Sequence, residues 1–302
     1  MKNQKKAMLF GLITVLLWST VASAFKITLS HFEPIQMVLI ASLTSIVLLT
    51  CIAFKQKKMH LLKKYFVKQP LFYLTLGVIN PFLYYLVLFK AYDLLPASQA
   101  QALNYTWAIT LTLLSVPFLG QKIRKKDWVA ILFSYTGALV IATKGDLLGL
   151  NFESPLGVAF ALLSTLIWAS YWIINAKNNN DPIVSLLLGF LLSLPFTLIA
   201  TALLSDFNFN SIEGILGAVY IGLFEMGISF VLWLMAIKLA TNTAQVSNLI
   251  FISPFISLFL LSAIVGEEIH PSTFIGLVTI IVGLVIQQIN WHNKRRVVTE
   301  KS

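Results

Sequence analysis

Charged residues are scarce in this sequence: Asp, Glu, Lys and Arg make up 11% of its 302 residues, against roughly a quarter in a typical soluble domain. The charges lie in short clusters, and hydrophobic residues make up 58% of the chain. A helix of about 20 apolar residues spans the roughly 30 Å hydrocarbon layer of a bilayer. The composition therefore excludes a soluble globular domain and predicts an all-α membrane protein.

Several chemical signatures are also missing. The single cysteine, Cys51, excludes an intramolecular disulfide. The sequence has no phosphate-binding glycine loop, so ATP-driven pumping is unsupported. The histidines, His31, His60, His270 and His292, are scattered over loops and tails, where they favour neither a metal site nor a catalytic base. We therefore expect no enzyme, no cofactor and no metal site.

Ten apolar stretches, each bounded by charged or turn residues, are candidates for membrane-spanning helices. Proline lies at or near the start of several of them, where its missing N–H costs least. The predicted spans are 8–25, 34–54, 70–90, 97–118, 128–143, 155–174, 182–204, 214–237, 244–264 and 272–290.

Basic residues gather on one side of this predicted bundle. The opposite side keeps Lys26, Lys90 and Lys144 and most of the acidic residues. By the positive-inside rule both termini are cytoplasmic, which requires an even number of spans. This topology explains the net charge of +10 better than nucleic-acid binding does. The basic side carries Lys2, Lys5, Lys6, Lys55, Lys57, Lys58, Lys63, Lys64, Lys68, Lys122, Arg124, Lys125, Lys126, Lys177, Lys238, Lys294, Arg295, Arg296 and Lys301.

The N-terminus has an alternative interpretation. Lys2, Lys5 and Lys6, a following apolar run and the small residues Ala22-Ser23-Ala24 are typical of a cleaved signal peptide. Cleavage would leave nine spans and remove the partner of one helix in the internal repeat described next, so we favour a first membrane span.

The chain matches itself at an offset near 145 residues. Ala100-Gln101-Ala102-Leu103-Asn104 falls on Ala244-Gln245-Val246-Ser247-Asn248, and Leu119-Gly120-Gln121-Lys122-Ile123 falls on Val265-Gly266-Glu267-Glu268-Ile269. Each repeat has five spans, an odd number, so the second copy enters the membrane from the opposite side. Inverted repeats of this kind are typical of secondary transporters, whose binding site lies near the bilayer midplane between the halves. We predict two inverted five-helix repeats, 1–150 and 151–302, around a central cavity.

These features resemble the ten-helix EamA-type exporters of the drug/metabolite transporter superfamily. The resemblance covers nearly the whole chain and rests on Trp18-Ser19, on the Ala-Gln-x-x-Asn pattern in spans four and nine, and on Gly266-Glu267-Glu268 followed by Gly276 and Gly283. The first half departs from the family pattern with Gly120-Gln121 in place of Gly-Glu, and we interpret this turn as structural. The resemblance implies export of amino acids, other small metabolites or toxic compounds, commonly driven by a proton gradient.

Glu225 lies far from both ends of span 214–237. An ionised carboxylate in hydrocarbon costs about 2.5–3.5 kcal/mol on insertion scales, so polar side chains there face the bundle interior or a wet cavity. Glu225, Ser229 and Trp233 share one helical face, as do Asn80 and Tyr84 at the equivalent positions of the first half. Glu225 is therefore either a proton-coupling carboxyl in the solute pathway or a structural acid hydrogen-bonded to a neighbouring helix.

Amides and aromatic rings provide further pathway candidates. Gln101 and Asn104 face together, and Gln245 and Asn248 repeat them in the second half, although interhelical hydrogen bonding explains such amides equally well. Aromatic side chains are abundant; many are expected at the membrane interfaces, and Trp107 in the core or against lipid. An aromatic cavity favours solutes with an apolar or cationic portion.

Helix movement requires positions that bend, and Pro81 and Pro254 are the hinge candidates because each removes a backbone hydrogen bond. Simple kinks that fit the packing are the alternative. Ala130 and Gly137 match Gly276 and Gly283, and these small residues predict close packing between spans five and ten.

The sequence therefore predicts a multi-pass exporter of small organic solutes in the bacterial plasma membrane, as a monomer or homodimer, with protons as a candidate coupling ion. A passive facilitator or channel is the alternative. A carrier of phosphorylated solutes would need intramembrane Lys or Arg, and the predicted spans contain none at depth. The predicted pathway residues are Trp18, Ser19, Asn80, Tyr84, Gln101, Asn104, Trp168, Tyr171, Glu225, Ser229, Trp233, Gln245 and Asn248.

Overall fold

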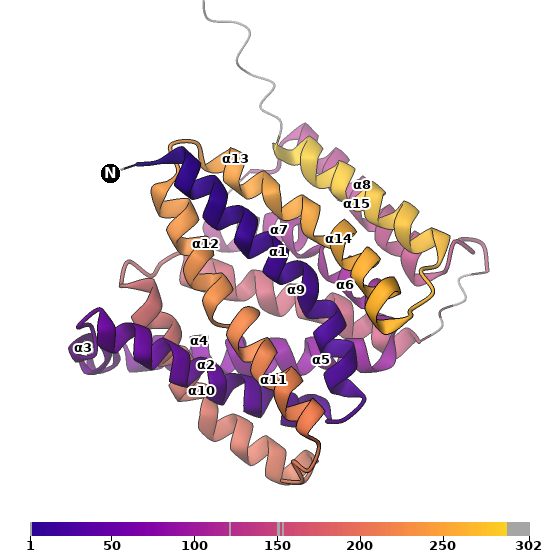
Figure 1. Cartoon of the computed structure of the whole chain (residues 1–302). Helices are drawn as coiled ribbons and strands as arrows, with labels where there is room; N and C mark the ends of the chain where they lie inside the picture. The colour runs from indigo at the N-terminus through magenta and orange to yellow at the C-terminus, as the bar shows by residue number, and fades with distance from the viewer. Residues whose placement is uncertain (1, 121, 150–151, 153, 289–302) are drawn as a thin grey trace, which may run out of the picture.

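A computed structural model describes residues 2–120, 122–149, 152 and 154–288, and every regular element in these ranges is a helix (Figure 1). The basic tail predicted on the cytoplasmic side (Lys294, Arg295, Arg296 and Lys301) lies outside the described residues, as does Gln121. The elements are α1 (Gln4–Leu29), α2 (Pro34–Lys55), α3 (His60–Lys68), α4 (Pro70–Gly77), η1 (Val78–Leu83), α5 (Tyr84–Leu94), α6 (Ala97–Asn104), α7 (Trp107–Leu119), α8 (Lys125–Ala142), α9 (Pro155–Asn175), α10 (Pro182–Leu204), α11 (Ile212–Phe224), α12 (Ile228–Leu239), α13 (Thr243–Ser247), η2 (Asn248–Ile252), α14 (Ser253–Leu260), η3 (Leu261–Val265) and α15 (Pro271–Gln288).

Ten helical stretches correspond to the ten predicted spans. Nine of them, within the described residues, are long and apolar enough to cross a membrane. The tenth, α8, has 18 residues and begins with the charged residues Lys125, Lys126 and Asp127. The segment 55–68, expected as a loop, contains the additional helix α3, which is nine residues long and too short to span a bilayer. The chain is thus an all-helical membrane protein.

One end of the bundle, called the basic face below, is held together by contacts between the two halves. The N–H of Asn3 donates to the carbonyl of Leu239 at 2.8 Å, so the start of α1 lies beside the end of α12. Lys58 forms an ion pair with Asp181 at 2.6 Å, which joins the end of α2 to the start of α10. These contacts bring alternate helix ends to one face, as the inverted repeat requires.

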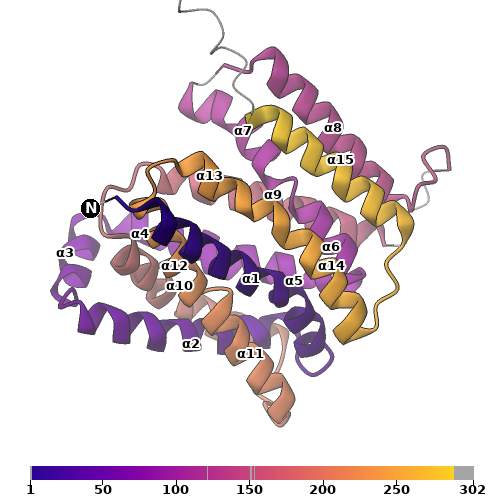
Figure 2. The ribbon, with the colours of Figure 1, turned by 45° about the horizontal axis from the view of Figure 1, so that its top comes forward.

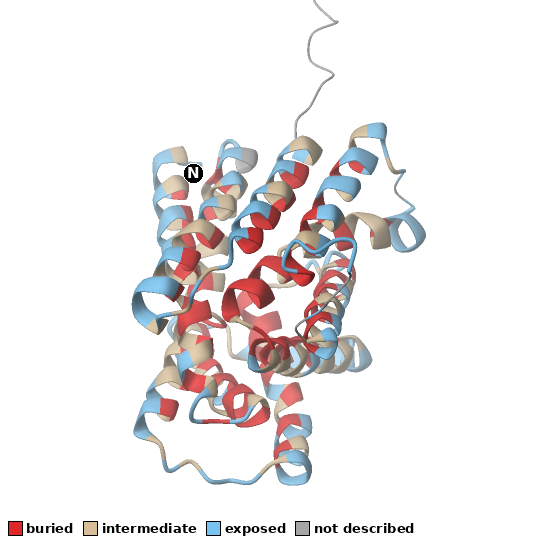
Figure 3. Ribbon diagram, turned by 90° about the vertical axis from the view of Figure 1, so that its right-hand side faces the viewer, coloured by how far each residue is buried: buried red, intermediate tan, exposed pale blue. Residues whose placement is uncertain are grey.

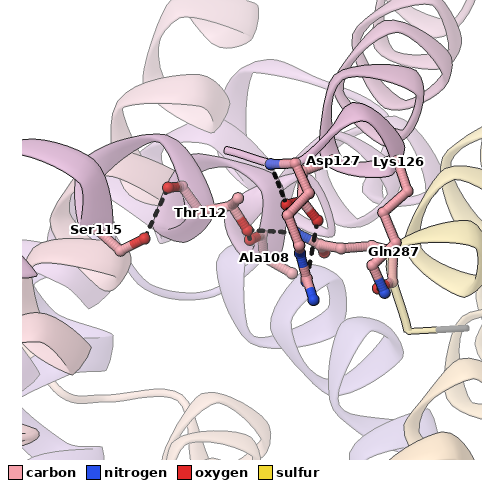
Figure 4. Close-up of polar contacts among 7 residues, drawn as sticks. Ala108, Thr112, Ser115, Lys126, Asp127 and Gln287 are labelled. Atoms are coloured by element: carbon pink, nitrogen blue, oxygen red, sulfur yellow. Dashed lines mark hydrogen bonds and ion pairs between the residues drawn. The ribbon is translucent and has the colours of Figure 1, made fainter. Parts of the chain in front are cut away.

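A polar cluster at the basic face joins α7, α8 and α15 (Figure 4). The Gln287 side chain donates to the Thr112 hydroxyl, and the Lys126 ammonium donates to the Gln287 carbonyl at 2.6 Å. Asp127 accepts from the Arg124 guanidinium at 3.0 Å and from the Arg124 backbone N–H at 2.8 Å, which closes the first turn of α8. Thr112 of α7 is therefore tied to the α8–α15 pair.

At the other end of the bundle, the opposite face, a second set of contacts joins the halves. The Gln36 amide, at the start of α2, donates to the Asp206 carboxylate at 3.0 Å beyond the end of α10. Phe32 and Phe209 pack edge to face at 5.7 Å. The two halves are thus fastened to each other at both ends.

Between these faces, helices of the two halves interleave instead of forming separate bundles. In Figures 1 and 2, α1 lies between α12 and α14, and it also packs against α11. The equivalent helix of the second half, α9, packs against α5, α6 and α7. Buried residues gather where these helices meet, and the outward sides of the helices are largely exposed (Figure 3). Exposed apolar side chains on that surface are expected where lipid is the solvent.

Equivalent helices also pair with each other, α2 with α10 and α8 with α15, as a two-fold relation between the halves requires. A Cβ atom added at Gly77 would lie 2.5 Å from the carbonyl oxygen of Gly189. In the other half, a Cβ atom added at Gly222 would lie 2.5 Å from the carbonyl oxygen of Ala41. Glycine is required at Gly77 and Gly222, because the backbone of the neighbouring helix lies where a larger residue would place its side chain.

Two equivalent spans are interrupted near their middle. Asn80 leaves the helical region between α4 and α5, with φ −143° and ψ 120°. In the second half, the turn Glu225–Gly227 separates α11 from α12. The predicted continuous helix 214–237 is therefore interrupted, and Ser229 donates its hydroxyl to the Phe224 carbonyl at the end of α11. The three residues predicted to share one helical face, Glu225, Ser229 and Trp233, therefore do not lie on one continuous helix.

Candidate functional site

A central cavity of about 150 Å³ lies among α1, α5, α6, α9 and the broken span α11–α12. Its wall contains seven of the predicted pathway residues, which come from both halves of the chain: Trp18, Tyr84, Gln101, Asn104, Trp168, Glu225 and Trp233. The other lining residues are Val21, Phe25, Leu88, Tyr92, Tyr105, Trp107, Trp172, Phe230, Ile250 and Ser253. Segments distant in sequence thus form one site near the middle of the bundle, where inverted-repeat carriers hold their solute.

Aromatic rings form most of the cavity wall. Trp168 stacks on Tyr84 with the ring centroids 4.4 Å apart and on Tyr171 with the centroids 5.4 Å apart. Across the cavity, Trp18 packs against Trp233 at 5.5 Å, and Phe230 meets both Trp18 and Trp168 edge to face. Tryptophan and tyrosine faces attract cations within about 6 Å and also pack well on apolar groups.

Glu225 places a carboxyl group among these rings. It is the one carboxylate among the described lining residues, and no Lys, Arg or His belongs to that set. Its Oε1 atom accepts a hydrogen bond of 3.1 Å from the Tyr85 hydroxyl of α5, so the acid joins the interrupted spans of the two halves. Glu225 therefore places a titratable side chain at a helix interruption beside the cavity, and broken helices of this kind bind ions or solutes in secondary transporters.

The amides of α6 differ from each other in their partners. Asn104 donates to the Ser164 hydroxyl of α9 at 2.8 Å, so it contributes an interhelical hydrogen bond while lining the cavity. The Oε1 atom of Gln101 is buried and has no hydrogen-bond partner among the described residues. Buried polar atoms are rarely left unpaired in the absence of a functional role, which makes Gln101 the stronger candidate for solute contact.

A second cavity of about 90 Å³ adjoins the first, because Trp172 and Phe230 line both. Asn80 and Tyr171, predicted as pathway residues, belong to its wall. From there the cavity reaches Asn178 and Asn180 in the loop between α9 and α10, at the basic face. The two cavities together trace a route from the centre of the bundle towards that face.

Four other predicted residues lie outside both cavities. Ser19 is buried and donates to the hydroxyl of Ser253, a lining residue, at 3.2 Å, so it supports the wall from behind. Ser229 is buried at the helix interruption. Gln245 and Asn248 are exposed, and Gln245 accepts from the Gln4 amide at 3.1 Å at the basic face. The repeat therefore places the two amide pairs in different surroundings. Both hinge candidates are buried: Pro81 follows the interruption at Asn80, and Pro254 lies in the first turn of α14.

Several lining residues were not singled out from the sequence. Trp107 lines the cavity and was expected in the core or against lipid. Tyr85 is buried behind the lining residues and is the partner of Glu225, although the predicted face of its helix included Tyr84 instead. Phe25, Tyr92 and Phe230 carried no signal beyond the general abundance of aromatic residues.

Comparisons with known proteins agree with this architecture. The sequence pattern of the EamA-like transporter family matches residues 5–143 and again residues 155–287. An uncharacterised transporter of Clostridium kluyveri is 27% identical over 296 residues, which cover 93% of each chain. An uncharacterised transporter of Acidianus ambivalens is 26% identical over 208 residues, 67% of this chain and 78% of that one. A protein of known crystal structure superposes with a TM-score of 0.68 over 95% of this chain and 97% of the other. Its sequence identity is 21%, so this likeness shows the fold alone.

Proposed function

Because the chain belongs to the EamA-like transporter family, we propose that it is a secondary transporter that exports small organic solutes through its central cavity by alternating access. The observation that carries this proposal is the site at the centre of the two halves, where aromatic rings surround Glu225 at the interruption between α11 and α12. A solute bound there can be released to either side if the halves rock about it.

The proposed solutes are amino-acid-like or drug-like compounds with an apolar or cationic portion. Stacked rings accommodate flat apolar groups, and a carboxylate beside aromatic faces suits an ammonium group. The lining residues provide no positive side chain for a phosphate or an isolated carboxylate. Polar atoms on Gln101 and Asn104 are available to orient the zwitterionic head of an amino-acid-like solute.

Glu225 is the proposed coupling carboxyl. Burial among aromatic rings disfavours the ionised form of an acid that lacks a positive partner. A proton and a cationic solute group would then compete for the same oxygen atoms, so that inward proton flow drives solute export. The Tyr85 hydroxyl holds Glu225 towards α5 and makes it responsive to movement between the halves.

The proposed location is the bacterial plasma membrane, with the basic face and both termini in the cytoplasm. The basic face and its turns carry Lys58, Lys122, Arg124 and Lys126. The opposite face carries Glu33 and Asp206. The route through the second cavity then opens towards the cytoplasm, the side from which an exporter takes its solute. A monomer is sufficient for this mechanism, since both halves of the site come from one chain.

The test is transport by purified protein in liposomes, with a panel of labelled amino acids and cationic drugs, with and without an imposed pH gradient. The variant is Glu225→Gln, and the matched control is Glu213→Gln, an exposed acid at the far end of the same span. Saturable, gradient-dependent transport that Glu225→Gln uncouples and Glu213→Gln preserves is the expected result. Gradient-independent transport by all three proteins would indicate a passive facilitator with a structural Glu225, and no saturable transport of any solute would overturn the proposal.

A further inference from the structure

The carboxylate of Glu267 closes a contact between the two halves at the opposite face. Glu267 lies in the turn between η3 and α15, and its two oxygen atoms accept the backbone N–H groups of Ala97 and Ser98, each at 2.9 Å. These N–H groups begin α6 and have no partner within their own helix. A negative charge is favoured there by the helix dipole, and charged acceptors make the stronger hydrogen bonds.

The residues around this contact seal that end of the pathway. Every residue of α6 from Ala97 to Leu103 is buried. The Lys26 ammonium donates to the carbonyls of Tyr92 and Leu95 at 3.2 and 3.4 Å, and Phe25 packs edge to face on Tyr92 at 5.2 Å. Phe25 and Tyr92 also form part of the central cavity wall, so this packing separates the cavity from the opposite face.

The stretch of the second half that matches α6 in the repeat lies at the basic face and is less buried than α6. Within that stretch, Thr241, Asn242 and Gln245 are exposed. None of the residues of η2, which follows this stretch, is buried. The second cavity also reaches the α9–α10 loop on this side. The opposite face has a recess of about 1090 Å³, but this recess shares no lining residue with the central cavity, whereas the second cavity shares Trp172 and Phe230 with it. The central cavity is therefore closed towards the opposite face and continues towards the basic face.

The two halves differ in charge at this turn as well as in packing. Glu267 corresponds to Gln121 in the first half, so a neutral amide stands where the second half has a carboxylate. A glutamine oxygen accepts N–H bonds without the charge that favours a helix start. We infer that Glu267 is the latch residue that holds the transporter closed at the opposite face and biases its resting state towards the conformation open at the basic face. This inference rests on the proposed alternating-access function.

The latch is testable without a known solute. In a Cys51→Ala background, Leu88→Cys places a reporter thiol in the wall of the central cavity. A membrane-impermeant maleimide added to intact cells reaches this thiol when the opposite face opens. We expect Glu267→Gln to raise the labelling rate at least about fivefold, because the resting population shifts towards the outward-open state. The neighbouring acid Glu268 is exposed, and Glu268→Gln is expected to leave the rate unchanged.

A second variant removes the donor side of the contact. Ala97 is the first residue of α6 and follows Pro96, whose φ of −52° and ψ of 138° suit a residue before proline. Ala97→Pro deletes the N–H group that Glu267 accepts while the acid stays in place. We expect it to raise labelling as Glu267→Gln does, and the two changes together to add little beyond either one.

Folding is checked for each variant by its monodisperse elution and thermal unfolding in detergent. Equal labelling of the parent, Glu267→Gln and Ala97→Pro would overturn the latch, whatever the transport assay gives. Raised labelling with no saturable transport would support the latch and count against the proposed transport function. If Glu267→Gln does not fold, Ala97→Pro alone decides, and labelling at the parent rate then rejects the latch.

Discussion

Gly137 of α8 and Gly276 of α15 approach each other reciprocally: a Cβ atom added to either residue would lie 2.5 Å from the carbonyl oxygen of the other. The equivalent contact joins Gly283 to Ala130, where an added Cβ atom would lie 2.8 Å from the carbonyl oxygen. The expected close packing of spans five and ten is confirmed by these distances. The two halves therefore meet along a seam between α8 and α15, where the small residues let the two backbones come close together.

Gly276→Ala is expected to destabilise the protein, because the added methyl group must displace the Gly137 carbonyl or Ile141. Overpacking of this kind costs about 1–3 kcal/mol. Gly189→Ala is the matched control, since a Cβ atom there would meet its nearest neighbour at 3.7 Å, an ordinary contact. Thermal unfolding in detergent should show a lower midpoint for Gly276→Ala alone. Equal midpoints for the two variants would mean that the seam adapts to the methyl group.

Trp168→Ala is expected to weaken solute binding about tenfold, which corresponds to roughly 1.4 kcal/mol of stacking or cation–π interaction. The change removes the ring that stacks on both Tyr84 and Tyr171. Trp128→Ala is the control because Trp128 is 59% exposed on α8. The measurement is the concentration of solute that gives half-maximal uptake. A similar rise of this concentration in both variants would argue for a general loss of stability. No rise in either variant would show that the Trp168 ring does not contribute to solute binding.

Asp127 is expected to make the stability of the basic face depend on pH. Partial burial raises the pKa of this carboxyl, but hydrogen bonds from the Arg124 side chain and backbone outweigh burial, so its pKa lies below its ordinary value. A lowered pKa stabilises the fold while the carboxyl is ionised, and this contribution is lost as the pH falls below about 4. Figure 4 shows the carboxylate at the start of α8, beside Lys126 and Gln287.

Replacing Asp127 by asparagine is therefore expected to lower the unfolding free energy at neutral pH by about 0.3–1 kcal/mol, the usual value of a negative charge in the first turn of a helix. The difference between this variant and the parent should shrink below pH 4. Unfolding midpoints measured from pH 3 to pH 7 check both statements, with the exposed acid variant Glu268→Gln as the control. A pH-independent difference would show that the lost contact is not ionic.

Sequence alone can point to a candidate site residue when its position in a span, or its counterpart in the repeat, is enough to single it out. Glu225 was predicted because a polar side chain in the middle of a span needs a polar place to face, and Trp18 was predicted because it is equivalent to Trp168 in the repeat. Ser229 and Tyr85 could not be assigned correctly, because the interruptions at Asn80 and Glu225 rotate the residues that follow them. Gln245 repeats Gln101 in sequence, yet it bonds to Gln4 at the basic face, because the inverted second half begins this span at the other end of the bundle.

The sequence by itself determined the membrane environment, the ten spans, the sidedness of charge and the inverted repeat, because hydropathy, charge and self-similarity are properties of position along the chain. The tertiary structure decided which side chains meet. Tyr85 and Glu225 are 140 residues apart, and Ala97 and Glu267 are 170 apart, so no local pattern connects them. Their contacts depend on how the helices of the two halves interleave, which no pattern along the chain encodes.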